Sequence, residues 1–294
     1  DHRDLLKEYR RQRQMCIRDR GLRDLWYGKA HVGDGADVVE REDLDPWQKF
    51  AHDIVMDSRH TDSDPLRMML LGSAGTGKSR TNRSFVSSKR NSVREEWEGP
   101  LQRAQLGAKT DAHAKVKDKM DEHVRNACVL AAPTGCASFQ LRFGASTLHR
   151  VFGIPVGYCG PWKNRSDARF LKIKTRMDQA RLFVVDEMSM VGRQMLGKIE
   201  YRLRNTLRSQ FQDRPDEVYL AGKNFVLSGD PKQANPIGDE PLYREGAYIG
   251  KGQNKPRGSD GTPDDAWDTR RPVSYTHLRA HETRGNLVCR LLLE

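Results

Sequence analysis

The stretch "LLGSAGTGKS", residues 70–79, decides the fold class of this chain. It has the spacing GxxxxGK[ST], in which backbone N–H groups of a glycine-rich loop surround phosphates, the lysine reaches the β and γ oxygens, and the final hydroxyl can hold Mg²⁺. The helix expected after the loop adds its N-terminal dipole to the same anion site. The pattern therefore predicts a P-loop that binds a nucleoside triphosphate through Gly72, Gly75, Thr76, Gly77, Lys78 and Ser79.

Short apolar runs on both sides of the loop predict strands. One run, "LRMMLL" at 66–71, leads directly into the loop, and "CVLAA", "RLFVV" and "NFVLS" follow along the chain with helical stretches between them. A short apolar run bounded by turn residues is typical of a buried strand. Strands that alternate with helices predict an α/β fold, with a parallel sheet and helices on both of its faces.

Two helices can be placed from their residue patterns. Asp45 and Pro46 fit the N-cap and the first position of a helix. Apolar residues that share one helical face are expected to point into the core. In the first helix these are Trp47, Phe50, Ala51, Ile54 and Val55, and in a later helix they are Val191, Met195, Ile199, Leu203 and Leu207.

The stretch "RTNRSFVSSKR" after the loop is unusually polar for a helix that packs on a sheet. Only Phe85 and Val86 offer good apolar packing surface, so we expect this helix to be short. Residues 83–125 are rich in charge and poor in apolar side chains, which favours a solvated insertion within the domain.

The two ends of the chain resemble translated sequencing adapters rather than protein. "RRQRQMCIRDR" at 10–20 and "VSYTHLRAHET" at 273–283 both read as common adapter sequences. Segments of this kind are set aside in arguments about fold. We therefore expect residues 1–20 and 273–294 to be non-native, with a lead-in at 21–45, an ATPase domain at 46–243 and an irregular segment at 244–272. The alternative is an ordinary basic N-terminus and an ordinary apolar C-terminus.

Composition permits several partners and identifies none. The formal net charge is +11 and stays positive without the two ends, which suits a polyanion such as nucleic acid but serves solubility equally well. The five cysteines show no paired CxxC spacing, so neither a disulfide framework nor structural zinc is expected. No apolar run reaches the ~18 residues that a membrane span needs, so we expect no membrane partner. The compartment stays open, with nucleus or mitochondrion expected for a eukaryotic source.

Two adjacent acids follow the apolar run at 182–185. Asp186 and Glu187 stand at the carboxyl end of an expected strand, where ligands of open α/β sheets collect. From a strand neighbouring the P-loop strand, Asp186 would hold Mg²⁺ through water and Glu187 would orient and deprotonate the attacking water, which indicates hydrolysis. A solvated acidic turn is the alternative. "NKPR" at 254–257 lacks the Asp of a guanine-reading NKxD, so ATP is expected rather than GTP.

A further polar turn follows the run "NFVLS". In "LSGDPKQANPI" at 227–237, Gln233 can hydrogen-bond the γ-phosphate or the attacking water, and so report whether the triphosphate is intact. Between the P-loop and the acids lies "AAPTGCASFQLRFGASTLHRVFGI" at 131–154.

Five stretches in this order, GSAGTGKS, APTGCAS, GASTLHRVFGI, VVDEMSMV and GDPKQANPI, resemble the Pif-one/RecD-like branch of superfamily 1 DNA helicases. The resemblance covers roughly residues 44–243. It implies a RecA-like P-loop domain, ATP and Mg²⁺ as cofactors, and single-stranded DNA and duplex junctions as partners of a monomer. It also implies an activity that couples ATP hydrolysis to 5′ to 3′ translocation and duplex unwinding.

The resemblance assigns roles to single residues. Gln48 matches a glutamine that contacts adenine, with a surface helix glutamine as the alternative. Lys78, Glu187 and Gln233 match the catalytic lysine, the base and the phosphate sensor, while Ser79 and Asp186 match the magnesium side. Residues that match contacts to single-stranded DNA are Pro133, Thr134, Gly135, Thr147 and His149, and for His149 a buried core histidine is an equal alternative.

The chain also departs from the family pattern. Pro231 and Lys232 stand where the family usually has aromatic residues, and Ala234, Asn235 and Pro236 stand where it has LPP. Nothing at 238–272 resembles the second RecA-like domain, whose arginine finger is worth about 10³ to 10⁵ in rate. We therefore expect this chain alone to bind ATP weakly, to hydrolyse it very slowly and to unwind nothing. A P-loop ATPase switch and a passive nucleic-acid binding module are the alternative functions.

Overall fold

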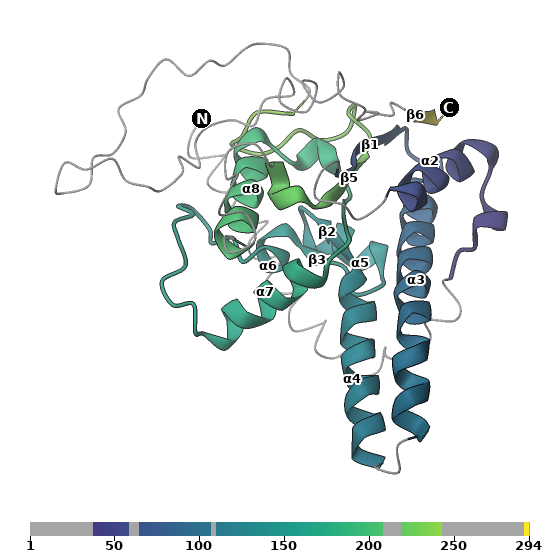
Figure 1. The fold of residues 1–294 in the computed structure, drawn as a ribbon. Helices are drawn as coiled ribbons and strands as arrows, with labels where there is room; N and C mark the ends of the chain where they lie inside the picture. Colours follow the sequence, from purple (N-terminus) through teal and green to yellow (C-terminus); the bar gives the residue numbers. More distant parts are fainter. Residues whose placement is uncertain (1–37, 59–64, 107–109, 208–218, 243–290, 294) are drawn as a thin grey trace.

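The computed structural model describes residues 38–58, 65–106, 110–207, 219–242 and 291–293 (Figure 1). Most of the expected lead-in, the segment at 244–272 with its NKPR stretch, and the adapter-like residues 1–20 and 273–290 lie outside these ranges. The proposed origin of the two ends therefore stays a prediction.

The described strands form one six-stranded sheet in the order β3-β2-β4-β5-β1-β6, and every described pairing is parallel. This confirms the predicted α/β fold with a parallel sheet. The apolar run before the P-loop becomes β1, and the three later runs become β2, β4 and β5. The bounds are β1 (Arg67–Gly72), β2 (Cys128–Ala132), β3 (Ser146–Thr147), β4 (Leu182–Val185), β5 (Asn224–Gly229) and β6 (Leu291–Leu293).

β6 falls within the segment predicted to be non-native. It pairs with the outer edge of β1, with Leu291 opposite Leu70. An edge strand offers unpaired N–H and C=O groups to any extended apolar segment. The pairing therefore says nothing about the origin of this segment.

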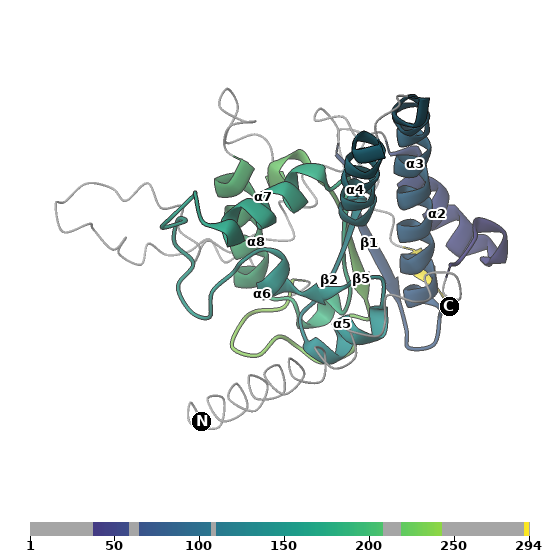
Figure 2. The same cartoon turned by 90° about the horizontal axis from the view of Figure 1, so that it is seen from below.

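Helices cover both faces of the sheet, as predicted. Figure 2 shows the sheet between a layer that holds α2 and α3 and a layer that holds α7 and α8. The helices are α2 (Pro46–Asp57), α3 (Lys78–Leu106), α4 (Thr110–Ala127), α5 (Gly135–Leu141), α6 (Leu148–Val151), α7 (Ala168–Gln179) and α8 (Arg193–Leu207), with short 3-10 turns η1 (Arg41–Asp43), η2 (Met188–Met190) and η4 (Tyr219–Gly222).

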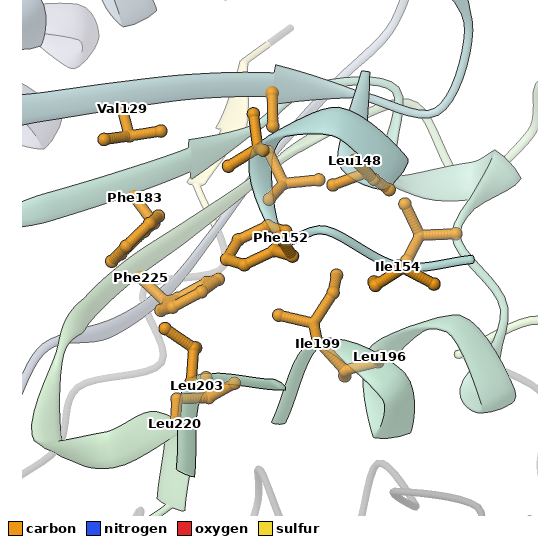
Figure 3. Close-up of a cluster of buried hydrophobic side chains, with 14 of the residues drawn as sticks. Val129, Leu148, Phe152, Ile154, Phe183, Leu196, Ile199, Leu203, Leu220 and Phe225 are labelled. Carbon is orange, nitrogen blue, oxygen red and sulfur yellow. The ribbon is translucent and has the colours of Figure 1, made fainter. Parts of the chain in front are cut away.

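Each central strand contributes side chains to two hydrophobic clusters, one on each face of the sheet, because successive side chains of a strand point to opposite faces. In β4, Phe183 joins the cluster beneath α8, whereas Val184 joins the cluster beneath α2 and α3. Figure 3 shows the first cluster, in which Phe152 and Phe225 lie beside Phe183. The ring centroids of Phe183 and Phe225 are 5.0 Å apart. The sheet edge that carries the site therefore rests on a core that is filled on both faces.

The predicted face of α8 is confirmed, and that of α2 is partly wrong. Asp45 does cap α2, and its side chain accepts from the backbone N–H groups of Trp47 and Gln48. However, Trp47 is 60% exposed and Phe50 is 48% exposed. The helix instead buries Gln48, Ala51, His52 and Val55. Gln48 and His52 hydrogen-bond to Thr76 and to Ser88 of α3, and these bonds set the rotation of the helix.

The helix after the P-loop is not short, and residues 83–125 are largely helical. α3 has 29 residues, and it packs along α4 to form a hairpin that extends past the sheet (Figure 1). The two helices share an apolar seam, while most charged side chains around it are exposed. The buried members of the seam are Val93, Met120, Val124 and Ala127, with Trp97 and Leu101 packed against them. The four-residue spacing of Val93, Trp97 and Leu101 is a helical signal that the high charge of the stretch concealed.

Within the residues that the structure describes, no helix is both long enough and apolar enough to span a membrane.

Candidate nucleotide-binding site

The P-loop, the acid pair and the Gln233 turn meet at one side of the sheet, along the edge that is formed by the carboxyl ends of its strands. They follow β1, β4 and β5, and the carboxyl ends of parallel strands lie on the same side. The expectation that the acid strand neighbours the P-loop strand is wrong, because β5 pairs with both of them and lies between. The turn that carries Gln233 therefore leaves the sheet between the P-loop and the acids. We call the carboxyl ends of β1, β5 and β4 the nucleotide half of this edge.

Two glycines give the P-loop its shape. Gly75 has φ +86° and Gly77 has φ +83°, a left-handed conformation that other residues rarely adopt. A Cβ at Gly77 would lie 2.3 Å from Nε2 of Gln48, whereas a Cβ at Gly75 would meet nothing within 4 Å. A Cβ at Gly77 would therefore strain the backbone and also force the Gln48 amide away from its bond to Thr76. α3 begins at Lys78, so its first N–H groups face the loop.

The ammonium group of Lys78 hydrogen-bonds to backbone oxygens of the P-loop. Its Nζ donates to the carbonyl oxygens of Gly72 and Ser73, both at 2.7 Å. Phosphate oxygens are stronger acceptors because the hydrogen bond is then charge-assisted on both sides. Lys78 also favours the ionised forms of Asp186 and Glu187, since its charge lowers the pKa of each. This coupling places the P-loop lysine and the two acids in one electrostatic site.

Gln48 is buried against the P-loop rather than exposed on a helix surface. Its Nε2 donates to the carbonyl oxygen of Thr76 at 3.2 Å, and its Oε1 accepts from the backbone N–H of Asp45 at 3.4 Å. These bonds tie the start of α2 to the loop. The contact to adenine that the resemblance implies for Gln48 stays a prediction.

Asp186 carries a buried carboxylate. Only 6% of the residue is exposed. Burial raises the pKa of its carboxyl, while hydrogen bonds from the Glu187 backbone and the Ser228 side chain, and then the charge of Lys78, oppose the rise. The alternative of a solvated acidic turn is therefore wrong for Asp186.

Glu187 is half-buried and has an unusual backbone. Its φ of 54° and ψ of 47° are left-handed, which costs a residue with a side chain roughly 1 kcal/mol or more and is common at functional sites. Burial raises the pKa of its carboxyl, and the neighbouring charge of Asp186 raises it further, while Lys78 lowers it. A raised pKa brings a carboxylate closer to the working range of a general base.

Gln233 lies on an exposed turn whose two ends are fixed. At the near end its N–H donates to the carbonyl oxygen of Asp230 at 3.1 Å. At the far end the carboxylate of Asp239 accepts from the N–H groups of Gln194 and Met195, at the start of α8. Sequence reasoning missed Asp239, because it caps a helix that begins 46 residues earlier in the chain and no local pattern marks it. The Asp239 cap links the Gln233 turn to the helix that follows the acids.

The predicted DNA contacts lie along the same carboxyl edge of the sheet, but at the ends of β2 and β3. Pro133, Thr134 and Gly135 follow β2, Thr147 ends β3, and the two strands pair directly. We call this region the DNA half. Thr134 Oγ1 accepts from the N–H of Ala137 at 3.2 Å and so caps α5. His149 is partly buried, and burial followed by the charge of Lys198 lowers its pKa. The pairing of Ala132 with Thr147 brings the end of β3 beside Pro133, and His149 follows in α6. Both roles of His149 stay predictions.

The oxygen donors at the nucleotide half fit a magnesium ion that arrives with its nucleotide. Among the described residues, no group of three or more His, Cys, Asp and Glu is arranged to hold a metal by itself. Mg²⁺ in nucleotide sites is held by one or two protein oxygens together with phosphates. The Ser79 hydroxyl and the Asp186 carboxylate are ligands of this type; Ser79 stands in the first turn of α3, and Asp186 directly follows β4.

One family model matches part of the chain. Residues 109–246 match the model of the family described as PIF1-like helicase, and this segment holds both halves of the edge except the P-loop itself. No curated protein matches the chain. The chain is similar to the Pif1 helicase from Candida albicans, with 23% identity, a TM-score of 0.43 and coverage of 66% of this chain and 34% of that chain. It is also similar to unliganded Pif1 from Bacteroides sp, with 22% identity, a TM-score of 0.42 and coverage of 67% and 34%. The chain thus spans about a third of the length of these helicases.

Proposed function

We propose that this chain is the RecA-like ATPase part of a DNA helicase of the PIF1-like family. In this proposal the whole protein couples ATP hydrolysis to 5′ to 3′ movement along single-stranded DNA. The observation that carries the proposal is the convergence at one sheet edge of a P-loop lysine, a buried acid pair and the Gln233 turn. The last two elements lie within the segment that matches the family model.

The residues of the nucleotide half have separate tasks. Lys78 exchanges its two backbone carbonyl partners for the β and γ oxygens of ATP. Ser79 and Asp186 would hold Mg²⁺, which would neutralise charge that develops on the phosphates. Glu187 accepts a proton from the attacking water, and the charge of the neighbouring Asp186 helps to raise the pKa of its carboxyl. Gln233 detects the γ-phosphate, and the Asp239 cap relays its position to α8.

The DNA half binds a single strand through contacts to its sugar–phosphate backbone and through stacking. Contacts to phosphates make the affinity depend on charge, so it should fall as the salt concentration rises. The arginine that completes the reaction comes from a second RecA-like domain of the whole protein, which works as a monomer at duplex junctions. We also assign it to the nucleus or mitochondrion if its source is eukaryotic.

One titration separates this function from its rivals. The affinity of the chain for an oligo-dT strand is measured by fluorescence anisotropy, with and without a non-hydrolysable ATP analogue and Mg²⁺. Because the two sites share one sheet, the helicase proposal expects the nucleotide to change DNA affinity several-fold in the unsubstituted chain and to have no effect in Lys78→Ala. DNA binding that ignores both the nucleotide and the substitution indicates a passive binding module. Nucleotide binding without any DNA binding indicates a switch.

A further inference from the structure

The start of α3 contains a cluster of polar side chains that have no access to solvent. Thr81, Asn82 and Ser84 are each 0% exposed, directly after the phosphate-binding residues. The two hydroxyl groups bond within the helix, since Thr81 donates to the carbonyl oxygen of Gly77 and Ser84 donates to that of Thr81. Asn82 differs, because its side chain leaves the helix and reaches the sheet.

The Asn82 side chain connects α3 to the acid pair through one residue of β5. Its Nδ2 donates to Oγ of Ser228 at 3.0 Å. Ser228 follows Leu227, which lies opposite Val185 in the register of β4 and β5, so its hydroxyl stands beside the Asp186 carboxylate and lowers the pKa of that group. Ser228 is 0% exposed, so the whole chain of hydrogen bonds runs through the interior. Asn82 stands three residues after Ser79, on the same side of the helix. The helix that carries Ser79 is therefore linked through Asn82 and Ser228 to the strand that carries Asp186.

Donor and acceptor rules fix the direction of these bonds. An ionised carboxylate can only accept, so the single hydroxyl proton of Ser228 points to Asp186. The Ser228 oxygen must then accept from Asn82, which requires the Nδ2 of the amide and not its Oδ1 to face Ser228. Among the described residues, the Oδ1 of Asn82 is correspondingly buried with no hydrogen-bond partner. A side chain that leaves a buried acceptor unsatisfied is a poor choice for stability alone.

We infer that Asn82 is a positioning residue for the magnesium side of the site, acting through Ser228 to hold the Asp186 carboxylate in its ion-binding orientation. This inference rests on the proposed function, because it assumes that Asp186 serves Mg²⁺ and nucleotide. Asn82 touches neither the ion nor the phosphates. Outer groups that orient a metal ligand typically change metal affinity by about 10 to 100-fold when they are removed.

The test compares nucleotide affinity with and without Mg²⁺ in matched variants of the full chain. Binding of a fluorescent ADP analogue is titrated in excess EDTA and at increasing Mg²⁺, and the readout is the Mg²⁺ concentration that gives half of the affinity gain. Asn82→Leu removes the amide with little change in volume, and Ser228→Ala removes the relay. Ser228→Thr keeps the hydroxyl, and Ser84→Ala is the control, because it removes a buried hydroxyl that bonds only within α3.

The inference expects a roughly tenfold rise in the half-effect concentration for Asn82→Leu and for Ser228→Ala, with affinity in EDTA unchanged. The double variant should be no worse than the more severe single variant, because both substitutions break one chain of bonds. Ser228→Thr and Ser84→Ala should match the unsubstituted protein. Equal Mg²⁺ dependence in all variants overturns the inference alone, whereas absence of any nucleotide binding in the unsubstituted chain overturns the proposed function with it. If Asn82→Leu fails to fold, the contrast between Ser228→Ala and Ser228→Thr decides the question.

Discussion

The two halves of the sheet edge are held in place in different ways. In the nucleotide half the polar groups are fixed by bonds between elements that are distant in sequence, such as Gln48 to Thr76 and Asn82 to Ser228. In the DNA half the clearest bond is local, from Thr134 to Ala137 at the start of α5. Long-range bonds hold reacting groups at set positions, as hydrolysis demands. A surface that grips a repeating sugar–phosphate chain needs less exact placement, and local caps suffice for it.

Among substitutions that test this difference between the two halves, Gly77→Ala is expected to have the largest effect on stability. The new methyl group meets Nε2 of Gln48 and the residue must also keep a φ of +83°, so we expect a loss of about 3 kcal/mol in the free energy of unfolding. Gly75→Ala is the matched control, because it has a similar φ of +86° but open space around it, and it should lose about 1 kcal/mol. Urea unfolding measures both. Equal losses would show that Gln48 does not brace the loop.

A smaller effect is expected from Asp186→Asn, and it should depend on pH. Burial raises the pKa of the Asp186 carboxyl above its unfolded value, so the folded state binds the proton more tightly than the unfolded state does. Ionising this group therefore costs stability as the pH rises above the unfolded pKa. Without Mg²⁺, the variant should melt a few degrees above the unsubstituted protein at pH 7, and this advantage should shrink as the pH falls towards 4.

Asp53→Asn provides the opposite case. The hydrogen bond and charge of Arg41 lower the Asp53 pKa to about 2, so its ionised form is favoured by folding. This substitution should lower or leave unchanged the melting temperature at pH 7. If Asp186→Asn instead raised the melting temperature by the same amount at every pH, ionisation of the buried Asp186 carboxyl would not be the cause.

In the DNA half, Thr134→Ala should remove the cap of α5 and cost about 1 kcal/mol of stability, while Thr134→Ser should cost little. Thermal unfolding measures the difference. Because the bond is local, the affinity for the ATP analogue should not change in either variant. A change in nucleotide affinity for Thr134→Ala would show that the two halves are mechanically coupled without DNA.

The same contrast explains what could be predicted from sequence. The P-loop, the acids after β4 and the buried face of α8 each follow from residues that are close together in the chain. The rotation of α2, the position of β5 between β1 and β4, and the bond from Asn82 to Ser228 depend on partners that fold against them from far away. The polar sequence after Ser79 was expected to form only a short helix, because the partner that accepts from Asn82 lies 146 residues along the chain. Sequence patterns thus identified the residues of the candidate site, whereas the contacts that position them became visible only in the structure.

The smallest effect is expected from removing residues 273–294, which include β6. β6 covers the outer edge of β1 immediately before the P-loop, with Leu293 opposite Gly72. If the nucleotide half is held by α2, α3 and β5, as the bonds of Gln48 and Asn82 indicate, this edge contributes little to it. The shortened chain should bind the ATP analogue with unchanged affinity and unfold within about 0.5 kcal/mol of the full chain. A marked loss of affinity would show that the loop depends on pairing along β1, and that the nucleotide half extends one strand further than its hydrogen bonds suggest.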